Sequence, residues 1–205
     1  MSYWEHTKPV HRARAVDVRG IAMAAVELLD AGGMRALTVR AVAQRLGVAP
    51  ASLYSRIESV DDLFDLALDD ALGADPTLGG FVAGDDLHAL MLEYYRHLTR
   101  HPWACHVIGM RAPRGPHYLR LSELMVGSLE SSRVADPLAT AYTLSNFVIG
   151  SAATAHIVAD EQTATVDPAV APRYARLHAS HAADGEAIVV AGLDALLAGA
   201  RPEVR

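Results

Sequence analysis

Three histidines in the middle of the chain have the spacing best suited to metal chemistry. His97 and His101 lie four residues apart, on one face of an expected helix, and His106 follows closely. Two imidazoles at this spacing can bind zinc, but a structural zinc site takes four ligands. No Cys, Asp or Glu completes an obvious set, so we expect no metal and no cofactor.

Catalytic motifs are the next possibility. The sequence contains no GxSxG, P-loop, HExxH or Rossmann glycine pattern, and no motif supplies a general base for Cys105. A single cysteine also leaves no internal disulfide framework. We therefore predict that the protein is not an enzyme.

The segment 38–57, TVRAVAQRLGVAPASLYSRI, has the pattern of a helix-turn-helix. Thr38 suits the N-cap of a first helix, and Gly47 suits the left-handed residue that ends it. Pro50 suits the first position of a second helix, which we expect to run to Ile57 with polar residues on its outer face. Such a pair presents its second helix to the major groove of DNA.

Charge is unevenly distributed along the chain, which carries −6 overall at pH 7. Residues 1–57 hold eight Lys and Arg against four Asp and Glu, a balance of +4, and the remainder holds ten against twenty, a balance of −10. This layout is expected if only the first part faces phosphates. Ordinary surface charge is the alternative explanation of this feature alone.

The elements that position these motifs all read as helices, so we predict an all-α fold. We expect a flexible basic arm at 1–16 that contains Arg12 and Arg14, a three-helix helix-turn-helix domain at 17–60, called the head, and a helical body at 61–205. The expected helices of the rest span 18–31, 60–72, 85–100, 102–110, 117–132, 136–159, 173–181 and 185–200, and the expected loops span 73–84, 111–116 and 160–172.

Residues 138–159 contain no Asp, Glu, Lys or Arg, which is a length sufficient to cross a membrane. Seven Ser, Thr, Asn and His side chains and the lack of a second span argue instead for a helix buried within protein. With the apolar last helix it could form a subunit interface, so we expect a homodimer and no membrane partner. Because the N-terminus lacks the apolar run of a signal peptide, we expect a cytoplasmic protein.

The segment 21–68 resembles the DNA-binding domain of the TetR family of transcriptional regulators in the order and spacing of its residues. The shared pattern consists of Leu37-Thr38-Val39-Arg40, Ala43, Leu46-Gly47-Val48, Leu53-Tyr54 and Leu63. The body is more loosely similar to the tetracycline-repressor branch, through His101-Pro102-Trp103, the 111–116 loop and Asn146-Phe147 to Gly150. The resemblance implies an N-terminal helix-turn-helix domain joined to a larger ligand-binding and dimerisation domain.

The family's DNA contacts carry over onto eight positions. Thr38 and Arg40 would reach a phosphate or a guanine edge, and Arg40 is the best candidate for direct base readout. Tyr54 would donate its hydroxyl to a phosphate, and Arg56 would add a charge-assisted contact. The positions that meet bases hold small side chains, which are Ala49, Ala51, Ser52 and Ser55.

Two departures from the family pattern weaken the expected DNA affinity. Ala49 stands where a hydroxyl residue often caps the recognition helix, and Val60 stands where a lysine often contacts phosphate. Asp61 and Asp62 follow, and their carboxylates would oppose phosphate at the start of the next helix. An alternative therefore stays open: a helical small-molecule-binding protein or enzyme whose helix-turn-helix has lost DNA binding.

The body offers side chains for a small-molecule site, with apolar walls and a few polar tips on helices that should converge. This set consists of Met91, Tyr94, Tyr95, Trp103, His106, Met110, Tyr118, Leu121, Tyr142 and Asn146. Ordinary core packing is the alternative for each residue taken singly. His106 is the nearest match to a histidine that the tetracycline-repressor branch uses for a drug-bound magnesium ion.

These inferences converge on a ligand-responsive transcriptional repressor. As a homodimer it would place the helix from Pro50 to Ile57 of each subunit in a major groove of a palindromic operator in double-stranded DNA, with half-sites a whole number of helical turns apart. A small-molecule effector would release it by favouring a dimer whose heads are wrongly spaced.

Overall fold

The computed structural model describes residues 2–5, 16–181 and 184–200, and all regular structure in these ranges is helical. The absence of strands from the described residues confirms the predicted all-α fold. Residues 6–15, with Arg12 and Arg14 of the predicted arm, lie outside the described residues.

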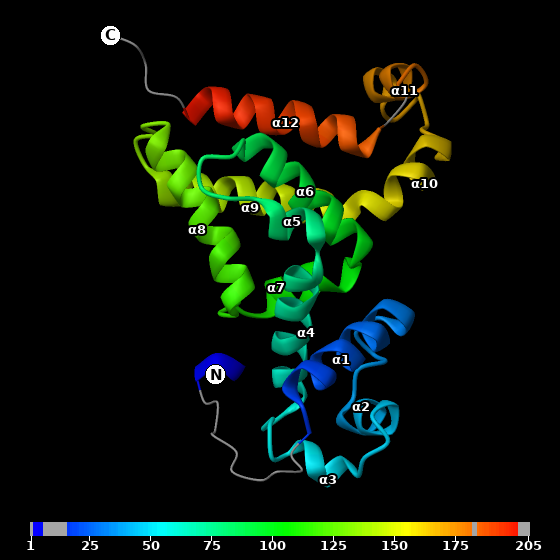
Figure 1. The fold of residues 1–205 in the computed structure, drawn as a ribbon. Coiled ribbons are helices and arrows are strands. Elements are labelled where there is room, and N and C mark those ends of the chain that lie inside the picture. Colours follow the sequence, from blue (N-terminus) through cyan, green and yellow to red (C-terminus); the bar gives the residue numbers. More distant parts are fainter. Residues whose placement is uncertain (1, 6–15, 182–183, 201–205) are drawn as a thin grey trace.

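The head forms one end of the molecule, and the helix that follows it, α4 (Val60–Ala74), leads from it into the body (Figure 1). The helices of the head are α1 (Val18–Gly32), α2 (Val39–Arg45) and α3 (Pro50–Leu53). The head has a small apolar core in which Ile21, Val42 and Leu53 are fully buried. Such a core fixes the angle between α2 and α3, as the predicted helix-turn-helix requires.

Helix α4 packs on the head and on the body alike. It contacts α1 on one side and α7 and α8 on the other, and every residue from 62 to 69 is buried. The helix therefore couples the two parts mechanically. The domain limit at residues 60 and 61 stays a prediction.

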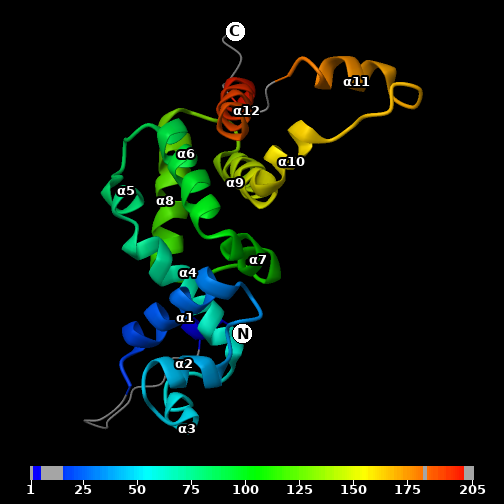
Figure 2. The ribbon, with the colours of Figure 1, turned by 90° about the vertical axis from the view of Figure 1, so that its right-hand side faces the viewer.

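The body stacks the remaining helices around α6 and α9. Their bounds are α5 (Pro76–Gly80), α6 (Leu87–Arg100), α7 (Pro102–Met110), α8 (Pro116–Ser131), α9 (Pro137–Thr154), α10 (Val158–Thr163), α11 (Pro172–His178) and α12 (Gly185–Ala200). In Figure 2, α12 lies across α9 and α6, and α10 and α11 extend away from the rest. None of the described helices is long and apolar enough to cross a membrane.

Two stretches of the body differ from the sequence expectation. The predicted loop at 73–84 contains α5, because Asp75 caps it by accepting the N–H groups of Thr77 and Leu78 and Pro76 occupies its first position. The predicted helix at 136–159 stops at Thr154, and a 3₁₀ turn leads into α10. The Thr154 hydroxyl donates to the carbonyl of Gly150 at 3.0 Å, a local bond that competes with regular helix.

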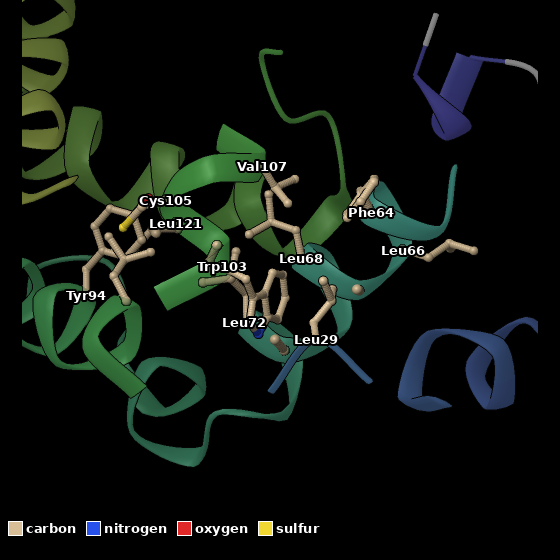
Figure 3. Packing of buried hydrophobic residues seen from close by; sticks show 14 of the residues in the cluster. Leu29, Phe64, Leu66, Leu68, Leu72, Tyr94, Trp103, Cys105, Val107 and Leu121 are labelled. Atoms are coloured by element: carbon tan, nitrogen blue, oxygen red, sulfur yellow. The ribbon is translucent and has the colours of Figure 1, made fainter. Parts of the chain in front are cut away.

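The apolar core runs without a break from the head into the body. Figure 3 shows Leu29 of α1, Leu68 and Leu72 of α4 and Trp103 of α7 within this cluster, each at most 5% exposed. Burial of side chains of this size contributes roughly 1.5–3 kcal/mol each. The hydrophobic effect therefore holds the head against the body.

A polar group, here called the junction cluster, lies where α1, α4, α6 and α7 meet. It consists of Asp30, Asp75, His97, Arg100, His101 and Trp103. Asp30 Oδ1 lies 2.7 Å from His101 Nδ1 and accepts the indole N–H of Trp103 at 2.6 Å. Asp75 Oδ2 lies 2.9 Å from His97 Nδ1 and accepts a bond from Arg100, and the two histidine rings are 5.0 Å apart.

Residues 2–5, the described part of the predicted flexible arm, are docked on α4. Asp65 Oδ2 accepts the hydroxyl of Ser2 at 3.0 Å and the backbone N–H of Tyr3 at 2.9 Å. Tyr3 is only 5% exposed. A buried carboxylate that a polar sequence does not reveal thus holds these residues against α4, and the flexibility of the arm stays a prediction.

Candidate functional site

The turn between α2 and α3 has the predicted geometry. The Thr38 hydroxyl accepts the N–H of Ala41 at 3.0 Å and so caps α2, and Gly47 has φ 65°, the left-handed conformation. Pro50 is the first residue of α3, and its N-cap Ala49 makes no side-chain bond. The missing hydroxyl noted in the sequence is therefore a real loss at the start of this helix.

Helix α3 is shorter than predicted. It ends at Leu53 rather than Ile57, and residues 54–56 form a turn. The Ser55 hydroxyl donates to the Ser52 carbonyl at 2.8 Å, and this side-chain bond competes with regular helix. The N–H of Ile57 still reaches the Leu53 carbonyl at 3.0 Å, so both apolar side chains stay buried.

Seven of the eight predicted DNA-contact residues are exposed on one end of the head, namely Thr38, Arg40, Ala49, Ala51, Ser52, Tyr54 and Ser55. Tyr54 is 58% exposed, although it is a large aromatic residue. Within the described ranges no side chain pairs with Arg40. This group is here called the reading surface. Within it, Arg40 and Tyr54 can donate to phosphates and base edges without first giving up a bond to a described residue, whereas the Thr38 and Ser55 hydroxyls already make bonds within the head.

Arg56 differs from the other seven. It is half-buried, and its Nε donates to the carbonyl of Val16 at 3.0 Å, just before α1. Part of its hydrogen-bonding capacity is thus used inside the head. The proposed phosphate contact would fall to the remaining guanidinium nitrogens.

Asp61 and Asp62, whose carboxylates were expected to oppose phosphate, lie in the first turn of α4. Ser59 caps the helix by accepting the N–H of Asp61 at 3.2 Å. Asp62 is 2% exposed, and its Oδ2 accepts the N–H of Glu58 at 2.6 Å, one residue before the position expected for a capping box. Asp61 Oδ2 lies 3.0 Å from a guanidinium nitrogen of Arg111. Both carboxylates are therefore engaged within the protein.

Sequence reasoning missed Arg111, Asp65 and Asp69. The acids of α4 at 61, 65 and 69 recur every four residues, which is a visible signal for one helical face. Their partners are some fifty residues further on in the chain. No local pattern connects such pairs.

The predicted effector region has a buried phenol at its centre. Tyr94 is 1% exposed, and its hydroxyl makes no hydrogen bond to a described residue. Burial first, then the nearby Tyr118 and Cys105 side chains, raise the pKa of Tyr94 well above its usual value, although no bond of acceptable geometry joins the two phenols. An unsatisfied buried hydroxyl of this kind would accept a ligand's polar group.

The structure places the predicted effector residues in two groups. Five are buried, namely Met91, Tyr94, Tyr95, Trp103 and Leu121, and Tyr118 is half-buried. The other four, His106, Met110, Tyr142 and Asn146, are exposed. A cavity of about 320 Å³ between α4, α5 and α8 is lined by Leu121 together with His117 and Arg120. None of the described cavities is lined by all ten predicted effector residues, so the effector site stays a prediction.

The three histidines do not converge. His97 and His101 belong to the junction cluster, where aspartates hold them, and His106 is exposed with Nδ1 3.4 Å from the Pro102 carbonyl. Among the residues described, no group of three His, Cys, Asp or Glu could hold a metal ion. The helical spacing in the sequence reflects packing between head and body.

Comparisons with known proteins agree with this geometry. Residues 21–67 match the family model of bacterial regulatory proteins of the tetR family. An HTH-type transcriptional regulator of Saccharopolyspora erythraea is 42% identical over 135 residues, which cover 64% of this chain and 57% of that protein. The HTH-type transcriptional repressor DrrR1 of Streptomyces coeruleorubidus is 31% identical over 136 residues, 63% of this chain and 50% of that protein.

The chain spans about half the length of these curated relatives. Its fold is similar along nearly its whole length to the TetR family protein ActR of Streptomyces coelicolor in complex with actinorhodin, with a TM-score of 0.74 and 22% identity over 92% of this chain and 96% of that one. The head therefore matches the tetR family of bacterial regulatory proteins, and the chain as a whole shares the fold of a TetR family protein.

Proposed function

We propose that the protein is a ligand-responsive transcriptional repressor that binds a palindromic operator as a homodimer. The observation that carries the proposal is the reading surface: a capped helix, a left-handed glycine turn and an exposed tyrosine and arginine on a rigidly packed head. A relative that is named a repressor supports the sign of regulation.

The dimer is supported by an apolar face that the subunit leaves uncovered. Leu138 and Tyr142 of α9 are 56% and 63% exposed, and Ile188 of α12 is 47% exposed. Exposed apolar surface on two neighbouring helices is typical of a subunit interface. Sedimentation at micromolar concentration should give a dimer, and a monomer would contradict this part of the proposal.

Release by an effector is supported by the fold and by the unsatisfied Tyr94 hydroxyl in the body. A protein of the same fold, ActR, is known in complex with actinorhodin. The effector would bind in the body and act on the head through α4, which packs on both. It can shift the equilibrium only by its different affinities for the two states of the dimer.

Footprinting tests the proposal directly. Purified protein is titrated onto DNA from upstream of its own gene and the neighbouring genes at low salt. Protection of a palindrome, with an affinity that falls steeply as salt rises, is the expected result. No protection of any fragment, or binding with a flat salt dependence, would favour the alternative of a small-molecule-binding protein that has lost DNA binding.

A further inference from the structure

A row of carboxylates on one face of α4 meets the loop between α7 and α8. Asp61, Asp65 and Asp69 recur at four-residue intervals, which places them one above another on the helix. Asp65 and Asp69 are buried, whereas the Asp61 side chain, in the first turn, is 52% exposed. Asp61 is thus the member of the row whose charge can act outside the protein.

Arg111 reaches this row from the body. Its guanidinium lies 3.0 Å from Asp61 Oδ2 and 3.6 Å from Asp65 Oδ2, and its side chain is 19% exposed. The planar fork of an arginine can engage two carboxylates at once, which a lysine does less well. One positive charge from the body therefore compensates negative charge in the first two turns of α4.

The far end of the same loop is fixed to α4 as well. Asp69 Oδ1 accepts the N–H of His117 at 2.9 Å and the N–H of Tyr118 at 3.2 Å, and so caps α8 from another helix. Gly115, the N-cap residue, has no side chain to do this, and a Cβ there would lie 2.1 Å from Asp69 Oδ1. The loop that carries Arg111 is held against α4 at both ends.

The position of Asp61 matters because α4 begins just after the reading surface. Only six residues separate Tyr54 from Asp61 along the chain. DNA bound at the reading surface would bring backbone phosphates to this end of α4. At physiological ionic strength charges interact over about 8 Å, so an uncompensated carboxylate here would repel the phosphates.

We infer that Arg111 raises DNA affinity without touching DNA, by neutralising Asp61 and Asp65 and holding Asp61 away from the phosphates. The inference rests on the proposed DNA-binding function. Arg111 is a positioning residue: a movement of the 111–115 loop away from α4 returns the charge of Asp61 to the DNA-facing end of the head. The loop thereby supplies an electrostatic route from body to head.

The test is an operator titration by fluorescence anisotropy with the full chain at several salt concentrations. Arg111→Gln should weaken binding about fivefold at low salt and by less at high salt, because salt screens the unmasked charge. Arg111→Lys should keep most of the affinity. The matched control is Arg114→Gln, which removes the same charge from the same loop but from a side chain that donates to the Pro113 carbonyl, and it should change the affinity less than twofold.

The double variant Asp61→Asn/Arg111→Gln separates masking from direct contact. Masking predicts that the operator affinity of the double variant lies within about twofold of the wild-type value. The control is Glu123→Gln, which neutralises an exposed carboxylate on α8; added to Arg111→Gln, it should not restore the affinity. If Arg111 contacts phosphate itself, Asp61→Asn fails to restore binding and the inference is overturned.

Three further outcomes separate failure of the variant, of the inference and of the proposed function. If Arg111→Gln does not fold, Asp61→Asn alone must still bind more tightly than Glu123→Gln, and equal affinities refute masking. If wild type binds its operator but Arg111→Gln behaves like Arg114→Gln, only this inference fails. If wild type binds no DNA, the proposed function fails and the inference falls with it.

Discussion

The reading surface and the junction cluster use polar side chains in opposite ways. On the reading surface, seven of the eight predicted contact residues are exposed, and Arg40 pairs with no described residue. In the junction cluster, Asp75 and His97 are buried, and Asp30 accepts bonds from two aromatic side chains of the body. The first set is available to an outside partner, and the second is committed to internal ones.

This difference separates stability from recognition. An exposed side chain can be removed at little cost to folding, whereas a buried charge that loses its partner destabilises the protein strongly. We therefore expect substitutions in the junction cluster to change the free energy of unfolding. Substitutions of reading-surface residues that make no bond to a described residue, such as Arg40 and Tyr54, should change DNA affinity alone.

Asp75→Ala should have the largest effect. It leaves the buried His97 and the Arg100 guanidinium without their acceptor and removes the cap of α5. We therefore expect a loss of about 3–4 kcal/mol of unfolding free energy from the lost cap and hydrogen bonds together. Urea denaturation measures it. Asp85→Ala, which loses one bond in an exposed loop, should cost less than about 1 kcal/mol, and equal losses would refute the distinction.

Acid should destabilise the junction next most strongly. Burial lowers the pKa of His97 from 6.5 to about 4. The hydrogen bond to Asp75 acts in the opposite direction, and the like charges of His101 and Arg100 lower the pKa further. As pH falls from 6.5 to about 4, the unfolded chain binds a proton that the folded chain does not.

Asp75 adds to the same trend. Burial would raise the pKa of Asp75, but bonds from His97, Leu78 and Arg100 outweigh burial and hold it below its usual value of 3.8. Its contribution is therefore lost only as the pH falls below that value, after the contribution of His97. We expect a loss on the order of 2–3 kcal/mol between pH 7 and pH 4. Denaturation at a series of pH values measures it, and His97→Gln should flatten the upper part of the curve. An unchanged slope would show that His97 does not cause it.

Gly115→Ala tests the contact between α4 and α8. A Cβ at Gly115 would lie 2.1 Å from Asp69 Oδ1, so the cap must move, at a cost of about 2 kcal/mol. Gly127→Ala in the middle of α8 meets nothing within 4 Å and should stabilise the helix by about 0.5–1 kcal/mol. Thermal unfolding of the two variants should therefore shift in opposite directions.

Arg40→Ala should change recognition without changing stability. We expect about a tenfold loss of operator affinity, or about 1.4 kcal/mol, and a relaxed base preference, because the side chain is exposed and has no described partner. The unfolding free energy should stay within about 0.5 kcal/mol of wild type. Tyr54→Phe, by comparison, should weaken binding to all sequences similarly. If Arg40→Ala left both the operator affinity and the base preference unchanged, Arg40 would have no role in base readout.

Ser55→Ala should have the smallest effect. The Ser55 hydroxyl already donates to the Ser52 carbonyl at 2.8 Å, so it has no second proton to offer a base or a phosphate. We expect less than a threefold change in operator affinity, or below about 0.7 kcal/mol. A loss of tenfold or more would show that the hydroxyl turns toward DNA in the complex.

The same contrast explains how far the sequence could be read. The head was predictable because its signals are local: Thr38 at the cap, Gly47 in the turn and Pro50 at the helix start each act within a few residues. The predicted end of α3 at Ile57 was wrong. Leu53 and Ile57 have the four-residue spacing of a helix, although the backbone between them forms a turn.

The body was less predictable because its determinants are distant in sequence. The Asp-Pro pair at residues 75 and 76 is a start signal for α5, but it lies in a stretch whose Gly and Pro content favours a loop. Asp65 holding Ser2 and Tyr3, or Asp69 capping α8, depends on tertiary contacts over 48 to 63 positions. Short-range periodicity carries no information about such pairs, so the described surroundings of α4 became visible only in the structure.

The bond between Trp103 and Asp30 gives the protein a built-in optical reporter. The indole of one of the chain's two tryptophans donates across the boundary from body to head, and the ring is 3% exposed. Replacing the other with Phe, as Trp4→Phe, leaves a single tryptophan, which lies at that boundary and can be excited selectively over the tyrosines. A separation of head and body would admit water to the indole and shift its emission to the red. Such a separation, including one caused by the proposed effector, can thus be followed in real time without attaching a dye.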